Sequence, residues 1–183
     1  QNGNKYNSAI LFDSQGNIAG IHNKSRLTFI GEYWPWGDWR PSFYLWLREK
    51  NPQTADYAIF SQENAYQPGQ QNLLSADFSS GQVFFAALIC LEIQYPNDLK
   101  KYKNSGARFF INQSSNRWVG FLGTNHFIYL TNNLKKIEAV WLNLPIISSG
   151  VNDYAGVILP NGQSILINYE NNIKNYSIYF GKV

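Results

Sequence analysis

The chain has 183 residues, of which 44% are hydrophobic and 16% aromatic, and this composition excludes an intrinsically disordered protein. Its length suits one domain with a single sizeable core. The formal net charge of +3 is small and not clustered, which gives no support for a nucleic-acid partner. No apolar run reaches the length of about 18 residues that a membrane-spanning helix needs. We therefore expect any membrane anchor to lie outside residues 1–183.

The first predicted elements are two β-strands, at 6–12 and 18–22. Asp13, Gly16 and Asn17 lie between them and suit a hairpin turn. Lys24 follows directly after the second strand, where loops that carry function usually begin. Clustered apolar residues predict a short helix over 39–50, with Pro41 in its first turn.

The second half of the chain alternates predicted strands and helices. A continuous apolar run over 83–89 is typical of a strand that is covered on both faces. A helix over 96–104 and a strand over 108–112 follow, and this order predicts a parallel crossover. A helix over 126–140 precedes three short strands, at 145–149, 154–159 and 163–169. These elements predict an α/β fold.

Two short segments carry residues of the types that act in catalysis. Cys90, the only cysteine of the chain, follows the apolar run, and Glu92 comes two residues later. The end of a strand in an open α/β sheet is a common place for a nucleophile. The alternative is that Cys90 is only a small buried hydrophobic residue. Upstream, Lys24 precedes Glu32 by eight residues.

Taken together, these segments resemble the nitrilase superfamily of carbon-nitrogen hydrolases, and within it the apolipoprotein N-acyltransferases. That family has a lysine followed by a Gly-Glu-Tyr stretch, and later a Cys-Tyr-Glu motif after a hydrophobic strand. Lys24, Glu32, Cys90 and Glu92 match its four functional positions. Further matches follow in the same order, at 106–112, 116–120, 125–126, 136–138 and 157–162.

The resemblance implies a nitrilase-like α-β-β-α sandwich, with an aromatic-rich arm or insert at about 33–72. The catalytic triad of this family is a glutamate, a lysine and a cysteine, and its glutamate lies upstream of the lysine. No glutamate precedes Glu32 in this chain. We therefore expect residues 1–183 to be a single, N-terminally truncated domain that is inactive by itself. A catalytically dead relative is the alternative.

The resemblance also implies roles for the matched residues. Cys90 would be the nucleophile, and the ammonium of Lys24 would lower the pKa of the thiol and stabilise the oxyanion. Glu32 would position Lys24 or relay its proton. The backbone N–H of Leu91 would be a second oxyanion donor. Glu92 is predicted at the pocket, although an acidic residue at a helix start also favours the helix dipole.

Aromatic residues are the last predicted part of the site. Trp118 either lines the pocket or only packs against its neighbours. Trp34, Trp36 and Trp39 are predicted to form a substrate arm at the membrane surface, because an indole has an apolar body and a polar edge. A small satellite core under a long loop is the alternative. Leu91 stands where the family has a tyrosine, so a hydroxyl that could contact the substrate is lost.

For the whole protein, the resemblance implies an enzyme that moves an acyl chain from a phospholipid, through a cysteine thioester, to the N-terminal amine of a lipoprotein. The expected partners are the phospholipid donor, the lipoprotein acceptor and a membrane surface, with neither a cofactor nor a metal ion. The domain would face the periplasm or the cell exterior from the cell membrane. A soluble amidase or carbamoylase of the same superfamily and an inactive binding remnant are the alternatives.

Overall fold

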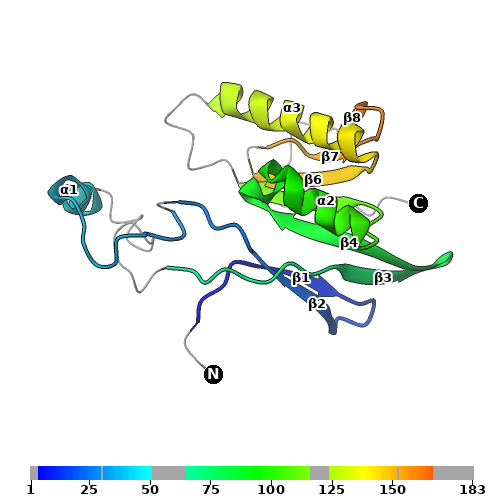
Figure 1. The fold of residues 1–183 in the computed structure, drawn as a ribbon, viewed down its shortest axis with the longest axis horizontal. Helices are drawn as coiled ribbons and strands as arrows, with labels where there is room; N and C mark the ends of the chain where they lie inside the picture. Colours follow the sequence, from blue (N-terminus) through cyan, green and yellow to red (C-terminus); the bar gives the residue numbers. More distant parts are fainter. Residues whose placement is uncertain (1–3, 30, 51–64, 116–123, 152, 167–183) are drawn as a thin grey trace, which may run out of the picture.

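The computed structural model describes residues 4–29, 31–50, 65–115, 124–151 and 153–166. Two β-sheets and the helices that accompany them make up this part of the chain (Figure 1). The elements in chain order are β1 (Ser8–Phe12), β2 (Ile18–Asn23), α1 (Ser42–Lys50), β3 (Leu74–Phe78), β4 (Gly81–Ile89), the 3-10 helix η3 (Cys90–Gln94), α2 (Pro96–Asn104), β5 (Phe110–Ser115), α3 (Thr124–Leu142), β6 (Ile146–Val151), β7 (Gly156–Ile158) and β8 (Ser164–Leu166).

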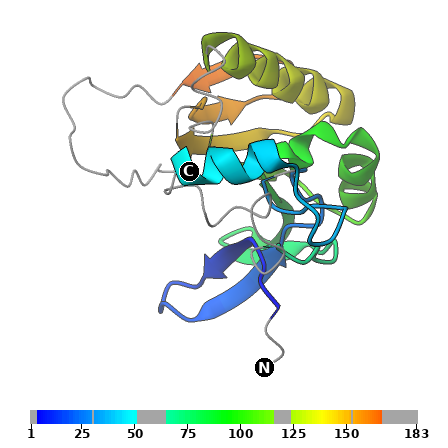
Figure 2. The same cartoon turned by 90° about the vertical axis from the view of Figure 1, so that its left-hand side faces the viewer.

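The larger sheet has six strands in the order β3-β4-β5-β6-β7-β8. Its central strands β4, β5 and β6 are parallel. Strand β3 pairs antiparallel with β4, β7 pairs antiparallel with β6, and β8 pairs antiparallel with β7. Helices α2 and α3 are the crossovers between the parallel strands, and both cover the same face of the sheet (Figures 1 and 2). The predicted parallel crossover is therefore present.

The two faces of β4 belong to two separate clusters of apolar side chains. Ala86 and Leu88 face the helices and pack in a core with residues of α2, α3 and the neighbouring strands. Phe85 and Ala87 point to the other face, where Leu11 of β1 packs against their cluster. Because side chains alternate along a strand, the continuous apolar run of β4 is what a strand covered on both faces requires.

The layers therefore follow the order helix, sheet, sheet, and the predicted α/β class is confirmed. The antiparallel β1–β2 pair lies against the face of the large sheet that the helices leave open (Figure 1). Among the described residues no helix covers the outer face of this pair, since α1 lies off one end of the sheets (Figure 1).

Among the differences from the sequence-based expectation, those of β3 and β5 affect the large sheet most. Strand β3 was not predicted, because its five residues mix small, acidic and apolar side chains. Strand β5 runs on to Ser115, three residues beyond its predicted end at Asn112. The added residues are polar, but they pair in register with β6, as Gln113 does with Ser149. Backbone pairing extends this strand into the region where the candidate site lies.

Candidate active site

The candidate site lies at the edge of the large sheet where the parallel strands end. Cys90 follows β4 directly, Ser114 lies near the end of β5, and Asp153 follows β6. The carboxyl ends of parallel strands meet at one edge of a sheet, which is where open α/β sheets bind their ligands. Residues far apart in the sequence thereby come together.

Cys90 is the first residue of η3 and forms the sharp turn that follows β4. Its φ of 55° is in the left-handed region, which a non-glycine residue rarely adopts. The side-chain amide of Asn112 supports this turn by donating a hydrogen bond of 3.2 Å to the carbonyl oxygen of Cys90. Backbone strain of this kind persists only where the surroundings hold it in place, and it is common at active sites.

The pKa of the Cys90 thiol lies above its usual value, as the net result of five influences, the smallest of which is a rise caused by Asp153. Burial raises the thiol pKa, and the ammonium of Lys24 lowers it. The carboxylate of Glu32 raises the pKa, whereas the backbone N–H of Leu91 lowers it. Lys24 is thus the largest influence that favours the thiolate, which is the reactive form of cysteine.

Lys24 is almost fully buried, with 1% of its side chain exposed, and it is held by acceptors on the loop that follows β2. Its Nζ donates to Glu32 Oε2 at 2.6 Å and to Thr28 Oγ1 at 3.0 Å. Glu32 also accepts from the backbone N–H of Thr28 and from the side chain of Asn7, both at 2.6 Å. Burial acts to raise the pKa of Glu32, but these donors outweigh it and hold the pKa below its usual value.

The backbone of Lys24 is fixed as well. Its N–H donates to the carbonyl of Asn7, and its carbonyl accepts from the N–H of Gly69, each at 2.8 Å. Gly69 passes so close to β2 that a Cβ there would lie 2.2 Å from the carbonyl oxygen of Asn23. Only glycine allows this approach. The position of Lys24 therefore depends on a segment that comes 45 residues later in the chain.

Glu92 does not line the pocket beside Cys90, where it was predicted. It is buried, and its carboxylate accepts from the backbone N–H of Ile89 at 2.8 Å and from that of Ser25 at 2.7 Å. Burial acts to raise the pKa of Glu92, but hydrogen bonds from His22 and these backbone groups lower it overall. Glu92 therefore joins the turn before Cys90 to the loop after Lys24.

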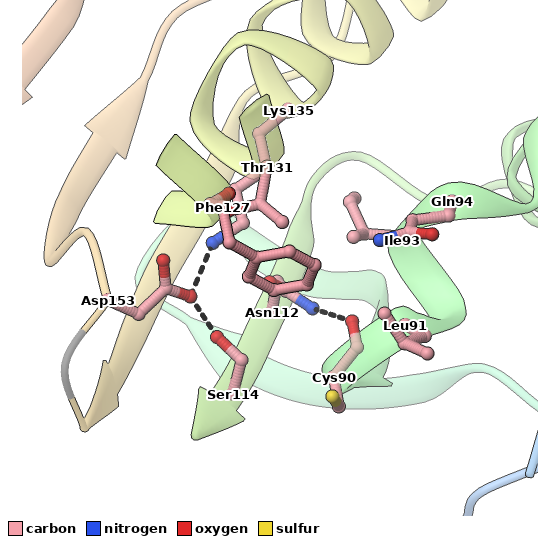
Figure 3. A pocket seen from close by; sticks show the side chains of 10 residues that line it. All are labelled: Cys90, Leu91, Ile93, Gln94, Asn112, Ser114, Phe127, Thr131, Lys135 and Asp153. Carbon is pink, nitrogen blue, oxygen red and sulfur yellow. Dashed lines mark hydrogen bonds and ion pairs between the residues drawn. The ribbon is translucent and has the colours of Figure 1, made fainter. Parts of the chain in front are cut away.

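A pocket opens beside Cys90, between η3, β5, α3 and the connection from β6 to β7 (Figure 3). Cys90, Leu91 and Phe127 are among its walls. The buried side chain of Asn112 also lines it, and its Oδ1 has no hydrogen-bond partner in the described part of the chain. This pocket has apolar walls and a polar end.

The polar end was missed in the sequence. There Lys135 and Asp153 form an ion pair of 2.8 Å, with 1% and 2% of their side chains exposed. Lys135 also donates to Ser148 Oγ at 2.9 Å, and Ser114 donates to the same carboxylate oxygen of Asp153 (Figure 3). No local sequence pattern predicts this cluster, because its members come from α3, β5, β6 and a loop.

The three tryptophans of the predicted arm have different surroundings. Trp34 is buried at the centre of an aromatic cluster, where it stacks on Phe29 and contacts Trp36 and Tyr44. Trp36 and Trp39 are more than half exposed. Trp34 thus matches the satellite-core alternative, and the other two are available for contact. Trp118 and part of the arm, residues 51–64, lie outside the described residues.

Two further features of the described residues concern cofactors and membranes. They contain no group of three or more histidine, cysteine, aspartate or glutamate side chains placed to hold a metal ion. None of their helices combines the length and the apolar character needed to cross a bilayer.

Comparison with known proteins agrees with this architecture. The family model described as carbon-nitrogen hydrolase matches residues 1–173. The apolipoprotein N-acyltransferases of Agrobacterium fabrum and Allorhizobium ampelinum are 30% and 29% identical, over 87% and 86% of this chain. The chain spans only 27% of the length of each.

Solved structures of the nitrilase superfamily share the fold. Nit3 from Saccharomyces cerevisiae superimposes with a TM-score of 0.54, at 18% identity, over 87% of this chain and 48% of that protein. An amidase from Nesterenkonia superimposes with a TM-score of 0.52, at 13% identity, over 88% of this chain and 51% of the amidase. The chain belongs to the carbon-nitrogen hydrolase family.

Proposed function

We propose that the chain is part of an apolipoprotein N-acyltransferase-like enzyme in which Cys90 carries the acyl chain as a thioester. The observation that carries the proposal is the thiol of Cys90, held in a left-handed turn within the influence of the ion pair between buried Lys24 and partly buried Glu32. The similarity to two apolipoprotein N-acyltransferases supports the choice of reaction.

The proposed reaction has two acyl transfers. The thiolate of Cys90 attacks an ester carbonyl of a phospholipid, a C–S bond forms, and the ester C–O bond breaks to release the lysophospholipid, which takes a proton. The amine of the lipoprotein then attacks the thioester, a C–N bond forms, the C–S bond breaks, and the amine proton is lost. Lys24 and the backbone N–H of Leu91 would stabilise the oxyanion in both steps.

The resemblance gives the proton-transfer base as a glutamate upstream of Lys24. Glu32 is already engaged by Lys24, Thr28 and Asn7, and the hydrogen bonds that lower its pKa make it a poor base at neutral pH. We assign it the positioning of Lys24. Residues 1–183 would then form part of a larger domain and would not catalyse the reaction without the rest of that domain.

The membrane part of the proposal rests on the aromatic arm. Trp36 and Trp39 are exposed, as are Phe43 and Trp46 of α1, and such residues favour the interface of a bilayer. The donor would be a phospholipid of that bilayer and the acceptor a lipoprotein anchored in it. The protein would act at the cell membrane, with this domain facing the periplasm or the cell exterior.

A second candidate is an amidase that uses water as the acceptor. It is favoured by the fold shared with the Nesterenkonia amidase, of which one structure has the acetamide moiety of fluoroacetamide bound covalently to its active-site cysteine. Both candidates use Cys90 as the nucleophile, and they differ in donor and acceptor.

The experiment that separates them offers both kinds of substrate to the full-length protein. We expect transfer of an acyl chain from phospholipid vesicles to a peptide with an N-terminal diacylglyceryl cysteine, and no release of ammonia from short aliphatic amides. The Cys90→Ala variant should lose the transfer. Ammonia release without acyl transfer would assign the amidase reaction instead.

A further inference from the structure

His22 is a fully buried histidine, and each of its two ring nitrogens lies within hydrogen-bond distance of an oxygen atom. It lies in β2, two residues before Lys24, with 0% of its side chain exposed. Its Nε2 is 3.0 Å from Glu92 Oε2, and its Nδ1 is 3.2 Å from Asn72 Oδ1.

Both of these oxygens act as acceptors. Glu92 Oε2 is a carboxylate oxygen that already accepts from the N–H of Ile89. The amide of Asn72 has its orientation fixed, because its Nδ2 donates to the carbonyl of Ile21 at 2.9 Å. A neutral imidazole has one N–H donor and one acceptor nitrogen, whereas the imidazolium has two donors. Only the charged ring satisfies both contacts.

We propose that His22 is a buried imidazolium and a positioning residue, which holds Glu92 as a carboxylate so that Glu92 can tie Lys24 to the Cys90 turn. The role in thiol reactivity stands by itself, and the effect on turnover rests on the function proposed above. Nothing in the sequence pattern indicated a role for His22.

The mechanism follows from the contacts of Glu92. Its two oxygens receive N–H groups from both sides of the site, Ile89 before the cysteine and Ser25 after the lysine. Without a cation beside it, a buried carboxylate takes up a proton. It would then lose acceptor capacity, and the loop that holds Lys24 would be released from the turn.

The other charged and titratable groups around Glu92 do not replace His22. Arg26 is directed to Asp98 on α2, with a distance of 2.6 Å. Tyr102 of α2 is neutral, because burial and the charge of Glu92 raise its pKa. Lys24 is paired with Glu32. Among the described residues, His22 is the cation in direct contact with the Glu92 side chain.

The test measures the alkylation of Cys90 by iodoacetamide as a function of pH in the full-length protein, with Cys90→Ala as the background for any other cysteine. We expect His22→Phe to slow the reaction about 10-fold at neutral pH and to move the profile by about one unit to higher pH. The matched control is His126→Phe, since His126 is an exposed residue of α3, and it should leave the profile unchanged. Iodoacetamide needs no lipid, so this result is independent of the acyl-transfer reaction.

A second pair of measurements protects the test against misfolding. His22→Gln keeps one donor without the charge, and it should show the same shift of the profile if His22→Phe does not fold. Nitrogen NMR of labelled histidine in the unaltered protein should show both ring nitrogens of His22 protonated at neutral pH. An unshifted profile in the folded variants, or a neutral His22 ring, would overturn the proposal.

Discussion

At the scale of single residues, the reactivity of Cys90 depends on Lys24. Burial holds the pKa of this thiol above its usual value, and the ammonium is the largest influence that opposes this rise. Replacing it with the uncharged side chain of Lys24→Met should move the alkylation profile of Cys90 to higher pH by about one to three units. The exposed Lys100 gives a control variant, Lys100→Met, which should react like the unaltered protein. An unmoved profile in Lys24→Met would remove Lys24 from the site.

A second prediction at this scale concerns the unexpected pair Lys135–Asp153. Both side chains are buried, so Lys135→Met leaves a buried carboxylate unpaired and should cost about 3–5 kcal/mol in the free energy of unfolding. Lys101 pairs with Asp98 but is 67% exposed, so Lys101→Met should cost at most about 1 kcal/mol. Denaturant unfolding of both variants measures the difference. Equal costs would mean that the buried pair has no structural role.

At the scale of elements, the close approach of Gly69 to β2 positions the end of that strand. A methyl group on Gly69 would overlap the carbonyl of Asn23, so Gly69→Ala should lower stability by about 1–3 kcal/mol and slow the alkylation of Cys90. At Gly31 a Cβ meets only Thr28 at 3.9 Å, and Gly31→Ala serves as the control. Thermal unfolding and iodoacetamide kinetics check both variants. A Gly69→Ala protein with the stability of its control would show that the segment can move away without consequence.

Strand β4 and the motif residues of the candidate site could be predicted from the sequence. The β4 strand was predictable, because an apolar run of that length is typical of a strand that is covered on both faces. Cys90, Lys24 and Glu32 were found through motifs with fixed spacing, and the structure brings Lys24 and Glu32 into contact. The roles given to all three stay predictions.

The residues that were missed have no local signal. His22 meets Glu92 across 70 positions, and Ser114 meets Asp153 across 39. Such pairs depend on how distant strands end beside one another, which the periodicity of a single element does not contain. For the same reason the contacts that Glu92 makes with Ile89 and with the loop after β2 could not be predicted from the sequence.

At the scale of the whole molecule, carboxylates with lowered pKa values make the stability depend on pH. The pKa values of Glu32, Glu92 and Asp98 lie below their usual values in the folded chain. Such groups stabilise the fold above their unfolded pKa, and this contribution is lost as the pH falls through the folded values. The melting temperature should therefore fall steeply below about pH 4. Glu92→Gln should have a lower melting temperature at neutral pH and a shallower decline, and a flat profile down to about pH 3 in the unaltered protein would contradict this.

The central proposal is that Cys90 carries the acyl chain, and intact-mass spectrometry of the full-length protein after incubation with phospholipid vesicles tests it most directly. We predict one added acyl chain on the peptide that contains Cys90, released by hydroxylamine as a thioester and discharged by a diacylglyceryl-cysteine peptide. The adduct should be absent in Cys90→Ala and at most weak in Cys90→Ser. An adduct or turnover that persists in Cys90→Ala would contradict the assignment of Cys90 as the nucleophile.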